Sequence, residues 1–266
     1  MSELEDDCKS FRVQVSGPSS APALLFSNSL TCDLTMWDAQ VEALSGLFRI
    51  IRYDGRGQGS SVAAPGPYSI GQLGRDALAI LNALEIESTL FCGLSMGGMV
   101  GMWLLTHAPE RITAAVLSNT SAHMGPPSLW DGRIALARSG GMAAVEEPTL
   151  TRWFPAAVRE SKPEIIDRMR SAIRNTPLDG YIACCEAIRD MDQRDSIRAI
   201  TRPTLVLVGK NDVATTPAMG RQIHQAVTGS RLVEIETGHI AAVERPDEFN
   251  RILLNFFASY TEAPPR

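Results

Sequence analysis

The chain has 266 residues, an ordinary share of hydrophobic and charged residues, and a formal net charge of −5 at pH 7. This length provides one large domain, or one domain with an insertion, with enough residues for a sizeable buried core. The acidic balance and the lack of a basic block argue against nucleic acid as a partner. No apolar run approaches the ~20 residues that span a bilayer, so the sequence predicts no membrane segment.

Cysteine usage and the start of the chain indicate the compartment. The first seven residues are acidic and carry no apolar signal region, so we expect a cytoplasmic protein. The five cysteines show neither CxxC nor metal-ligand spacing, so we expect reduced thiols and no metal site. The adjacent pair Cys184 and Cys185 lies in a helical pattern, where packing is a better interpretation than reactivity.

Short apolar runs alternate with helical patterns along most of the chain. Strands are predicted at residues 11–15, 23–26, 48–53, from 89 up to the glycine at 93, and at 114–118, 204–208 and 232–236. Helices are predicted at 36–47, 68–84, directly after residue 95, and at 246–260. Strands that alternate with helices imply an α/β fold with a doubly wound, mostly parallel sheet.

The interval from about residue 123 to 199 interrupts this alternation. It has amphipathic helical patches at 129–138, 164–173 and 181–188 and no convincing strand. We interpret it as a helical cap, residues 123–198, inserted between two strands of a core formed by residues 1–122 and 199–266.

The stretch Gly93-Leu94-Ser95-Met96-Gly97 carries the Gly-x-Ser-x-Gly pattern of a nucleophile elbow. A serine at the tip of a sharp strand-to-helix turn sits in strained backbone, and glycine two residues to either side lets the flanking chains pass closely. The alternative is a glycine-rich turn that holds an ordinary serine. The apolar run before the pattern, the helical pattern after it and possible partners downstream favour the nucleophile.

A serine hydroxyl needs a base that takes its proton, and the base needs an acid that holds its tautomer. His239 follows the last predicted strand directly, where such a base is expected. The other histidines fit less well. His107 and His224 lie within helical stretches, and His123 precedes any plausible base position, although it could line the pocket.

The acid should come from the loop after the preceding strand, and Asp212 stands there. A plain turn aspartate or a helix cap is the alternative interpretation of Asp212. Its place between Ser95 and His239 favours the catalytic role. Asp192 and Asp195 precede that strand and are weaker rivals.

Two backbone amides are expected to stabilise the oxyanion. The Met96 amide directly follows the nucleophile, and the loop after an early strand offers the Leu30 amide as the second donor. Each such donor is worth about 3–4 kcal/mol of the barrier. Asp54 and Arg56 look catalytic by residue type, but a pair that stabilises a turn is the better interpretation.

The whole chain resembles the α/β-hydrolase fold, and more narrowly the 3-oxoadipate enol-lactonases of the β-ketoadipate pathway of aromatic catabolism. The narrower likeness rests on residues 26–30 with 33 and 36–38, and on 130–134, 152–154 and 180–190. Asn28-Ser29 stands where generic members have His-Gly, an exchange typical of the lactonases. Thr31-Cys32 and Asp131 depart from the Gly-Thr and Asn that are common in the family.

This resemblance implies a cofactor-free hydrolase that opens 3-oxoadipate enol-lactone, a small acidic lactone, through an acyl-enzyme on Ser95. The substrate carboxylate needs a cation in a dehydrated pocket. Arg133 is the first candidate, with Trp130 and Trp153 as pocket walls. The alternative is that Arg133 lies on a solvated helix face and that the tryptophans merely seal the cap to the core.

Two other function classes fit the same residues. A carboxylesterase or cofactor-free perhydrolase would use the same triad, because the triad fixes the reaction class and not the substrate. A ligand-binding receptor that kept the hydrolase pocket is the non-enzymatic alternative. The intact Ser95, Asp212 and His239 argue against that receptor.

Overall fold

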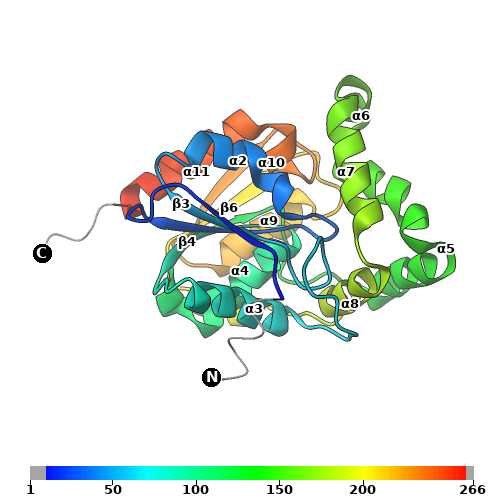
Figure 1. Cartoon of the computed structure of the whole chain (residues 1–266), viewed down its shortest axis with the longest axis horizontal. Helices are drawn as coiled ribbons and strands as arrows, with labels where there is room; N and C mark the ends of the chain where they lie inside the picture. The colour runs from blue at the N-terminus through cyan, green and yellow to red at the C-terminus, as the bar shows by residue number, and fades with distance from the viewer. Residues whose placement is uncertain (1–9, 262–266) are drawn as a thin grey trace, which may run out of the picture.

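The computed structural model describes residues 10–261, and Figure 1 shows how their elements are arranged. The interpretations of the acidic start and of Cys8 concern residues outside this range. Among the residues described, no helix is both long and apolar enough to cross a lipid bilayer.

A seven-stranded sheet with the order β1-β3-β2-β4-β5-β6-β7 forms the centre of the structure. β1 pairs with β3 in antiparallel fashion, and all other neighbouring pairs are parallel, which confirms the predicted mostly parallel sheet. The strands are β1 (Val13–Ser16), β2 (Ala23–Ser27), β3 (Arg49–Tyr53), β4 (Thr89–Leu94), β5 (Ile112–Ser118), β6 (Thr204–Gly209) and β7 (Arg231–Ile235).

Helices cover both faces of the sheet. Figure 1 shows α2, α10 and α11 on one side and α3 and α4 on the other, while α9 packs against β6 and β7. The bounds of these helices are α2 (Asp38–Leu44), α3 (Ile70–Ala83), α4 (Met96–His107), α9 (Pro217–Ala226), α10 (Ala241–Glu244) and α11 (Pro246–Phe257).

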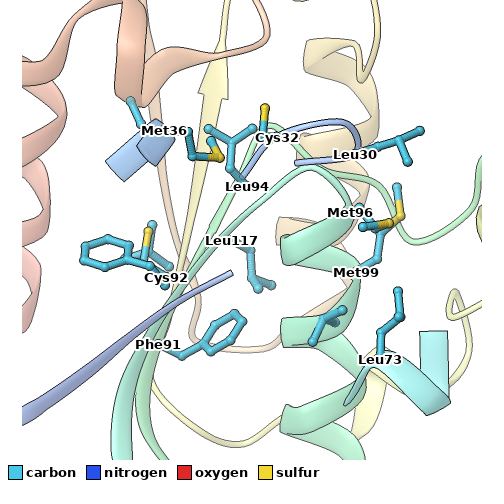
Figure 2. Packing of buried hydrophobic residues seen from close by; sticks show 14 of the residues in the cluster. Leu30, Cys32, Met36, Leu73, Phe91, Cys92, Leu94, Met96, Met99 and Leu117 are labelled. Carbon is cyan, nitrogen blue, oxygen red and sulfur yellow. The ribbon is translucent and has the colours of Figure 1, made fainter. Parts of the chain in front are cut away.

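The central strands are continuous apolar runs because both of their faces are covered. All six residues of β4 are buried. In Figure 2, Phe91 points toward α4 and Cys92 points to the opposite face of the sheet, as the two-residue period of a strand requires. Cys184 and Cys185 are also buried, and burial is the largest of the effects that raise the pKa of Cys185 to about 12. The packing interpretation of this pair is therefore confirmed.

Element boundaries depart from the prediction where a local cap or turn takes over. The helix predicted from residue 36 begins earlier, as the 3₁₀ turn Leu34–Trp37, because the Asp33 side chain accepts the Thr35 N–H at 2.9 Å and caps the turn. The closing helix ends as α11 at Phe257 and continues as the 3₁₀ turn Ala258–Tyr260.

Four helices are inserted between β5 and β6, and they lie together at one end of the sheet in Figure 1. We call them the inserted helices: α5 (Pro127–Trp153), α6 (Ala156–Ser161), α7 (Pro163–Asn175) and α8 (Leu178–Arg189). His123 and Asp192, which flank them, form an isolated antiparallel bridge that the helical pattern did not predict.

The first inserted helix is broken in its middle. Gly141 has φ +64° and ψ −169°, so α5 consists of two segments, residues 127–140 and 142–153, joined at an angle. Only glycine adopts this backbone freely, because a side chain would clash with its own main chain. The two segments can therefore bring side chains together that a straight helix would hold far apart.

Candidate active site

Ser95 stands at the turn between β4 and α4, with φ +58° and ψ −115°, outside the regions that a serine normally occupies. The flanking glycines are required by space. A Cβ on Gly93 would lie 2.2 Å from the Gly97 carbonyl oxygen, and a Cβ on Gly97 would lie 2.0 Å from that of Ser27. The turn is held because the Ser95 N–H donates to the Ser118 carbonyl at 2.9 Å. The geometry is that of a nucleophile elbow.

His239 and Asp212 lie at the ends of β7 and β6, and both are 2 % exposed. His239 Nδ1 lies 2.8 Å from Asp212 Oδ2. This contact assigns the proton of the neutral ring to Nδ1, which leaves Nε2 as the atom free to act as a base. His239 and Ser95 line the same pocket.

The Asp212 carboxylate is saturated with donors. Its Oδ1 accepts the N–H groups of Ala214 and Thr215, and its Oδ2 accepts from His239, the Thr215 hydroxyl and the Asn119 amide. Burial alone would raise the pKa of Asp212, but the charge and hydrogen bond of His239 and the other donors outweigh it, so the pKa lies below its usual value. Asp212 is therefore ionised at neutral pH and able to hold an imidazolium.

The proposed oxyanion amides lie on either side of the elbow. Met96 is the first residue of α4, so its N–H has no carbonyl within the helix to bind. Figure 2 shows Leu30 on the loop after β2 and Met96 at the start of α4, and the Leu30 side chain lines the pocket with Ser95. Asn28 supports this loop, because its Nδ2 donates to the Tyr53 carbonyl at 2.8 Å and its Oδ1 accepts the Trp37 indole N–H at 2.8 Å.

The pocket lies between the sheet and the inserted helices. All three predicted binding residues, Trp130, Arg133 and Trp153, line it. The Trp153 ring centroid lies 6.4 Å from that of His239, so this side chain is a wall next to the proposed base.

A second arginine joins Arg133 in the pocket. Arg133 lies over the Trp130 ring, with its guanidinium carbon 4.3 Å from the ring centroid. Arg152 also lines the pocket and donates to the Thr149 hydroxyl at 3.1 Å. Burial first, and then the nearby charge of Arg133, lower the pKa of Arg152 to about 10. Across residues 10–261, neither arginine forms an ion pair with a carboxylate.

The kink at Gly141 produces this pair. Arg133 and Arg152 are 19 positions apart, which is about 28 Å along a straight helix. Both nevertheless line one pocket, because they lie on the two different segments of α5. Two uncompensated cations in a partly buried pocket favour an anionic ligand.

Comparison with known proteins places this geometry in a family. The sequence profile of the alpha/beta hydrolase fold matches residues 22–246. The chain belongs to the α/β-hydrolase fold family.

Relatives within this family include lactonases. The chain is 39% identical over 234 residues to 3-oxoadipate enol-lactonase 2 of Acinetobacter baylyi, covering 88% of each sequence. It is 34% identical to 3-oxoadipate enol-lactonase 1 of the same organism, covering 94% of each. A crystal structure of the enol-lactonase from Burkholderia xenovorans superposes with a TM-score of 0.92 at 41% identity, over 93% of this chain and 96% of that one.

The rival residues of this α/β-hydrolase lie away from the pocket. His107 stacks on Trp103 at the end of α4, and His224 on α9 bonds the hydroxyl of Ser230, which lies beyond that helix. His123 is half-buried and its Nδ1 contacts the Met191 carbonyl. None of these histidines lines the pocket with Ser95.

The rival acids are engaged elsewhere too. Asp192 pairs with Arg194, and Asp195 is fully exposed beside Arg198. Neither lines the pocket.

The prediction that Asp54 and Arg56 pair with each other is wrong. Asp54 is fully buried and accepts the N–H groups of Leu34 and Ser60, while Arg56 donates to Asp76 on α3. A tight loop turns the two side chains to different neighbours, so each stabilises the loop separately.

Arg152 and Asn119 were missed as site residues. Arg152 adjoins the predicted wall Trp153, and the glycine pair at 140–141 is the sequence signal for a break that could bring it to Arg133.

No group of three or more His, Cys, Asp or Glu side chains among residues 10–261 is arranged to hold a metal ion.

Proposed function

We propose that this α/β-hydrolase opens 3-oxoadipate enol-lactone to 3-oxoadipate, as a step of the β-ketoadipate pathway. The observation that carries the proposal is the pair of uncompensated arginines, Arg133 and Arg152, in the pocket that also holds Ser95 and His239. Sequence identity of 34–39% to two enol-lactonases supports the same substrate class.

The reaction begins at Ser95. Its Oγ attacks the lactone carbonyl carbon while His239 Nε2 takes the hydroxyl proton, and Asp212 stabilises the imidazolium that forms. The amides of Leu30 and Met96 hold the negative charge on the carbonyl oxygen. Collapse of this intermediate breaks the ring C–O bond, and the ring oxygen leaves as an enolate, which conjugation stabilises relative to an alkoxide. The enolate takes the proton from the His239 imidazolium, so the imidazole is neutral again before deacylation begins.

Deacylation repeats the same chemistry with water. The open product remains linked to Ser95 as an ester until His239 deprotonates a water molecule that attacks the acyl carbon. The proton then returns to Ser95 Oγ as the acid leaves. The product is a dicarboxylate, since hydrolysis of the lactone creates a second acid group. No step requires a metal or an organic cofactor.

The arginines bind the carboxylate that the substrate carries into the pocket. An unpaired buried carboxylate is strongly unfavourable, and a guanidinium offers two parallel N–H donors to it. Arg133 is fixed over Trp130, and Arg152 is fixed by Thr149. We also propose that residues 123–198 act as a cap, because the inserted helices supply both arginines and both tryptophans.

The test compares substrates on the purified protein. We expect a higher kcat/KM for the enol-lactone than for a neutral aryl ester such as 4-nitrophenyl acetate. A preference for the aryl ester would favour the carboxylesterase or perhydrolase alternative instead. Ser95→Ala should abolish both activities and leave the circular dichroism spectrum unchanged. Ligand binding without any turnover in the wild type would favour the receptor.

A further inference from the structure

Asn119 directly follows β5 and has a left-handed backbone, with φ +45°. Left-handed backbone is uncommon outside glycine, and asparagine tolerates it better than most residues. Its N–H donates to the Leu207 carbonyl of β6 at 2.8 Å, and the residue is 2 % exposed. A strained, buried polar residue at the end of a central strand calls for an explanation.

The side chain of Asn119 has one defined orientation. Its Oδ1 accepts the Ser118 hydroxyl at 2.8 Å, which fixes Nδ2 as the donor on the other side. Nδ2 then donates to Asp212 Oδ2 at 3.0 Å and to the Gly238 carbonyl at 3.1 Å. Both amide hydrogens therefore bind loops that carry members of the proposed triad.

The two acceptors matter for the base. Asp212 Oδ2 is the same oxygen that faces His239 Nδ1, and Gly238 is the residue before His239. The Gly238 N–H is held by Glu244 at 2.8 Å, and the His239 N–H by the Trp153 carbonyl at 2.8 Å. Asn119 therefore joins the acid loop to the base loop from a third loop, while the Thr215 hydroxyl lies 3.2 Å from His239 Nδ1 within the acid loop itself.

We propose that Asn119 is a positioning residue that fixes Asp212 relative to His239 and limits how strongly Asp212 Oδ2 holds the imidazolium. The inference rests on the proposed function, because it concerns the same triad. Asn119 does not line the pocket, so it acts through Asp212 and His239 and not on the substrate.

The alternative is a purely structural role, and the pH profile separates the two. A donor on Oδ2 stabilises the carboxylate and weakens its hold on a proton at His239. Removing the Asn119 Nδ2 donor favours protonated His239. The fall of kcat/KM on the acid side of its pH profile, the acid limb, should therefore move to higher pH. The substitution leaves the other charged and titratable groups unaltered. Asp212 contacts His239, Glu244 holds the preceding Gly238 N–H, and Arg133, Arg152 and Tyr181 line the same pocket.

The first variant is Asn119→Gly, because glycine accepts the left-handed backbone and removes only the side chain. Asn119→Asp is the second, since it keeps the shape but places a carboxylate against Asp212. We expect the acid limb to rise by about half a pH unit or more in the glycine variant and by more in the aspartate variant. Misplacement of the base should lower kcat/KM by up to about 100-fold.

The control is Asn250→Ala in α11, because the Asn250 side chain bonds none of the proposed triad residues. Asn250 is 6 % exposed, accepts from Gln40 at 3.0 Å and donates to the Ala39 carbonyl at 3.2 Å. Its loss should lower thermal stability and leave the acid limb where it is. The assay is hydrolysis of 4-nitrophenyl acetate from pH 5 to 9, followed at the isosbestic wavelength of the product.

Labelling of Ser95 by an organophosphonate, read by mass spectrometry, separates the two proposals. A wild-type chain whose Ser95 does not react would overturn the proposed function and this inference together. If wild-type Ser95 reacts, an acid limb unchanged in both Asn119 variants would overturn the inference and leave the function standing. If Asn119→Gly does not fold, Asn119→Asp alone decides. An acid limb at higher pH than in the wild type supports the inference, and an acid limb at the same or a lower pH overturns it.

Discussion

Arg152→Met should make the protein more stable and should weaken its binding of acidic substrates. The fold lowers the pKa of Arg152 from 12.5 to about 10, first through burial and second through the charge of Arg133. At 1.36 kcal/mol per pKa unit, this difference of about 2.5 units costs the folded protein about 3 kcal/mol for holding the charge. Methionine keeps the apolar stem and removes that charge.

The net gain is smaller, because the substitution also removes the hydrogen bond to Thr149, which is worth about 1 kcal/mol. We therefore expect about 2 kcal/mol of additional stability, or a Tm that is higher by about 4–8 °C. Loss of a charge-assisted hydrogen bond to the substrate carboxylate should raise KM for the enol-lactone by about 10–100-fold. KM for a neutral aryl ester should hardly change.

Differential scanning fluorimetry and steady-state kinetics on both substrates measure these effects. Arg138→Met is the matched control, because Arg138 lies on the same helix with its side chain 65% exposed and loses the same charge. It should change neither Tm nor KM appreciably. A lower Tm for Arg152→Met, or an equal rise of KM for both substrates, would refute the reasoning.

Three further substitutions test neighbouring parts of the site. Arg133→Ala should raise KM for the acidic lactone and leave that for a neutral ester nearly unaffected; equal effects in the kinetic assay would mean that Arg133 does not bind the carboxylate. Gly141→Ala should lower the free energy of unfolding measured in urea by about 1–3 kcal/mol, because φ +64° and ψ −169° are open essentially to glycine alone, and it should raise KM for the lactone, although nothing lies within 4 Å of the added Cβ. Asp212→Asn should be less stable than the wild type at pH 7. Because folding holds the pKa of Asp212 below 3.8, this advantage of the wild type exists above that pH and is lost as the pH falls through the lower folded value. A stability difference that does not shrink in acid unfolding would contradict this.

The sheet and the elbow were predictable because their signals are local. Apolar runs and the Gly93–Gly97 pattern each lie within a few residues, and the close approaches at both glycines arise at the turn itself. Ser95, Asp212 and His239 follow β4, β6 and β7, and the carboxyl ends of parallel strands meet at one edge of the sheet. Those assignments needed no knowledge of long-range packing.

The missed parts depend on how distant segments meet. Arg152 reaches the pocket only because Gly141 breaks α5, and helical periodicity does not report the direction of a break. Asn119 acquires its contacts where the loops after β5, β6 and β7 converge. Arg56 pairs with Asp76, 20 residues further on, instead of with its neighbour Asp54. Composition and spacing carry no information on such partner choice.

The backbone carbonyl of Trp153 affects how chimeric proteins can be built from members of this family. The last residue of α5 holds the His239 backbone at 2.8 Å, while the side chain of the same residue lines the pocket. A chimera that exchanges the whole insertion would therefore replace a support of the proposed base, His239, along with the residues of the insertion that line the pocket. Swaps that end before residue 153 keep the recipient's own support, and they should transfer substrate preference with less loss of turnover.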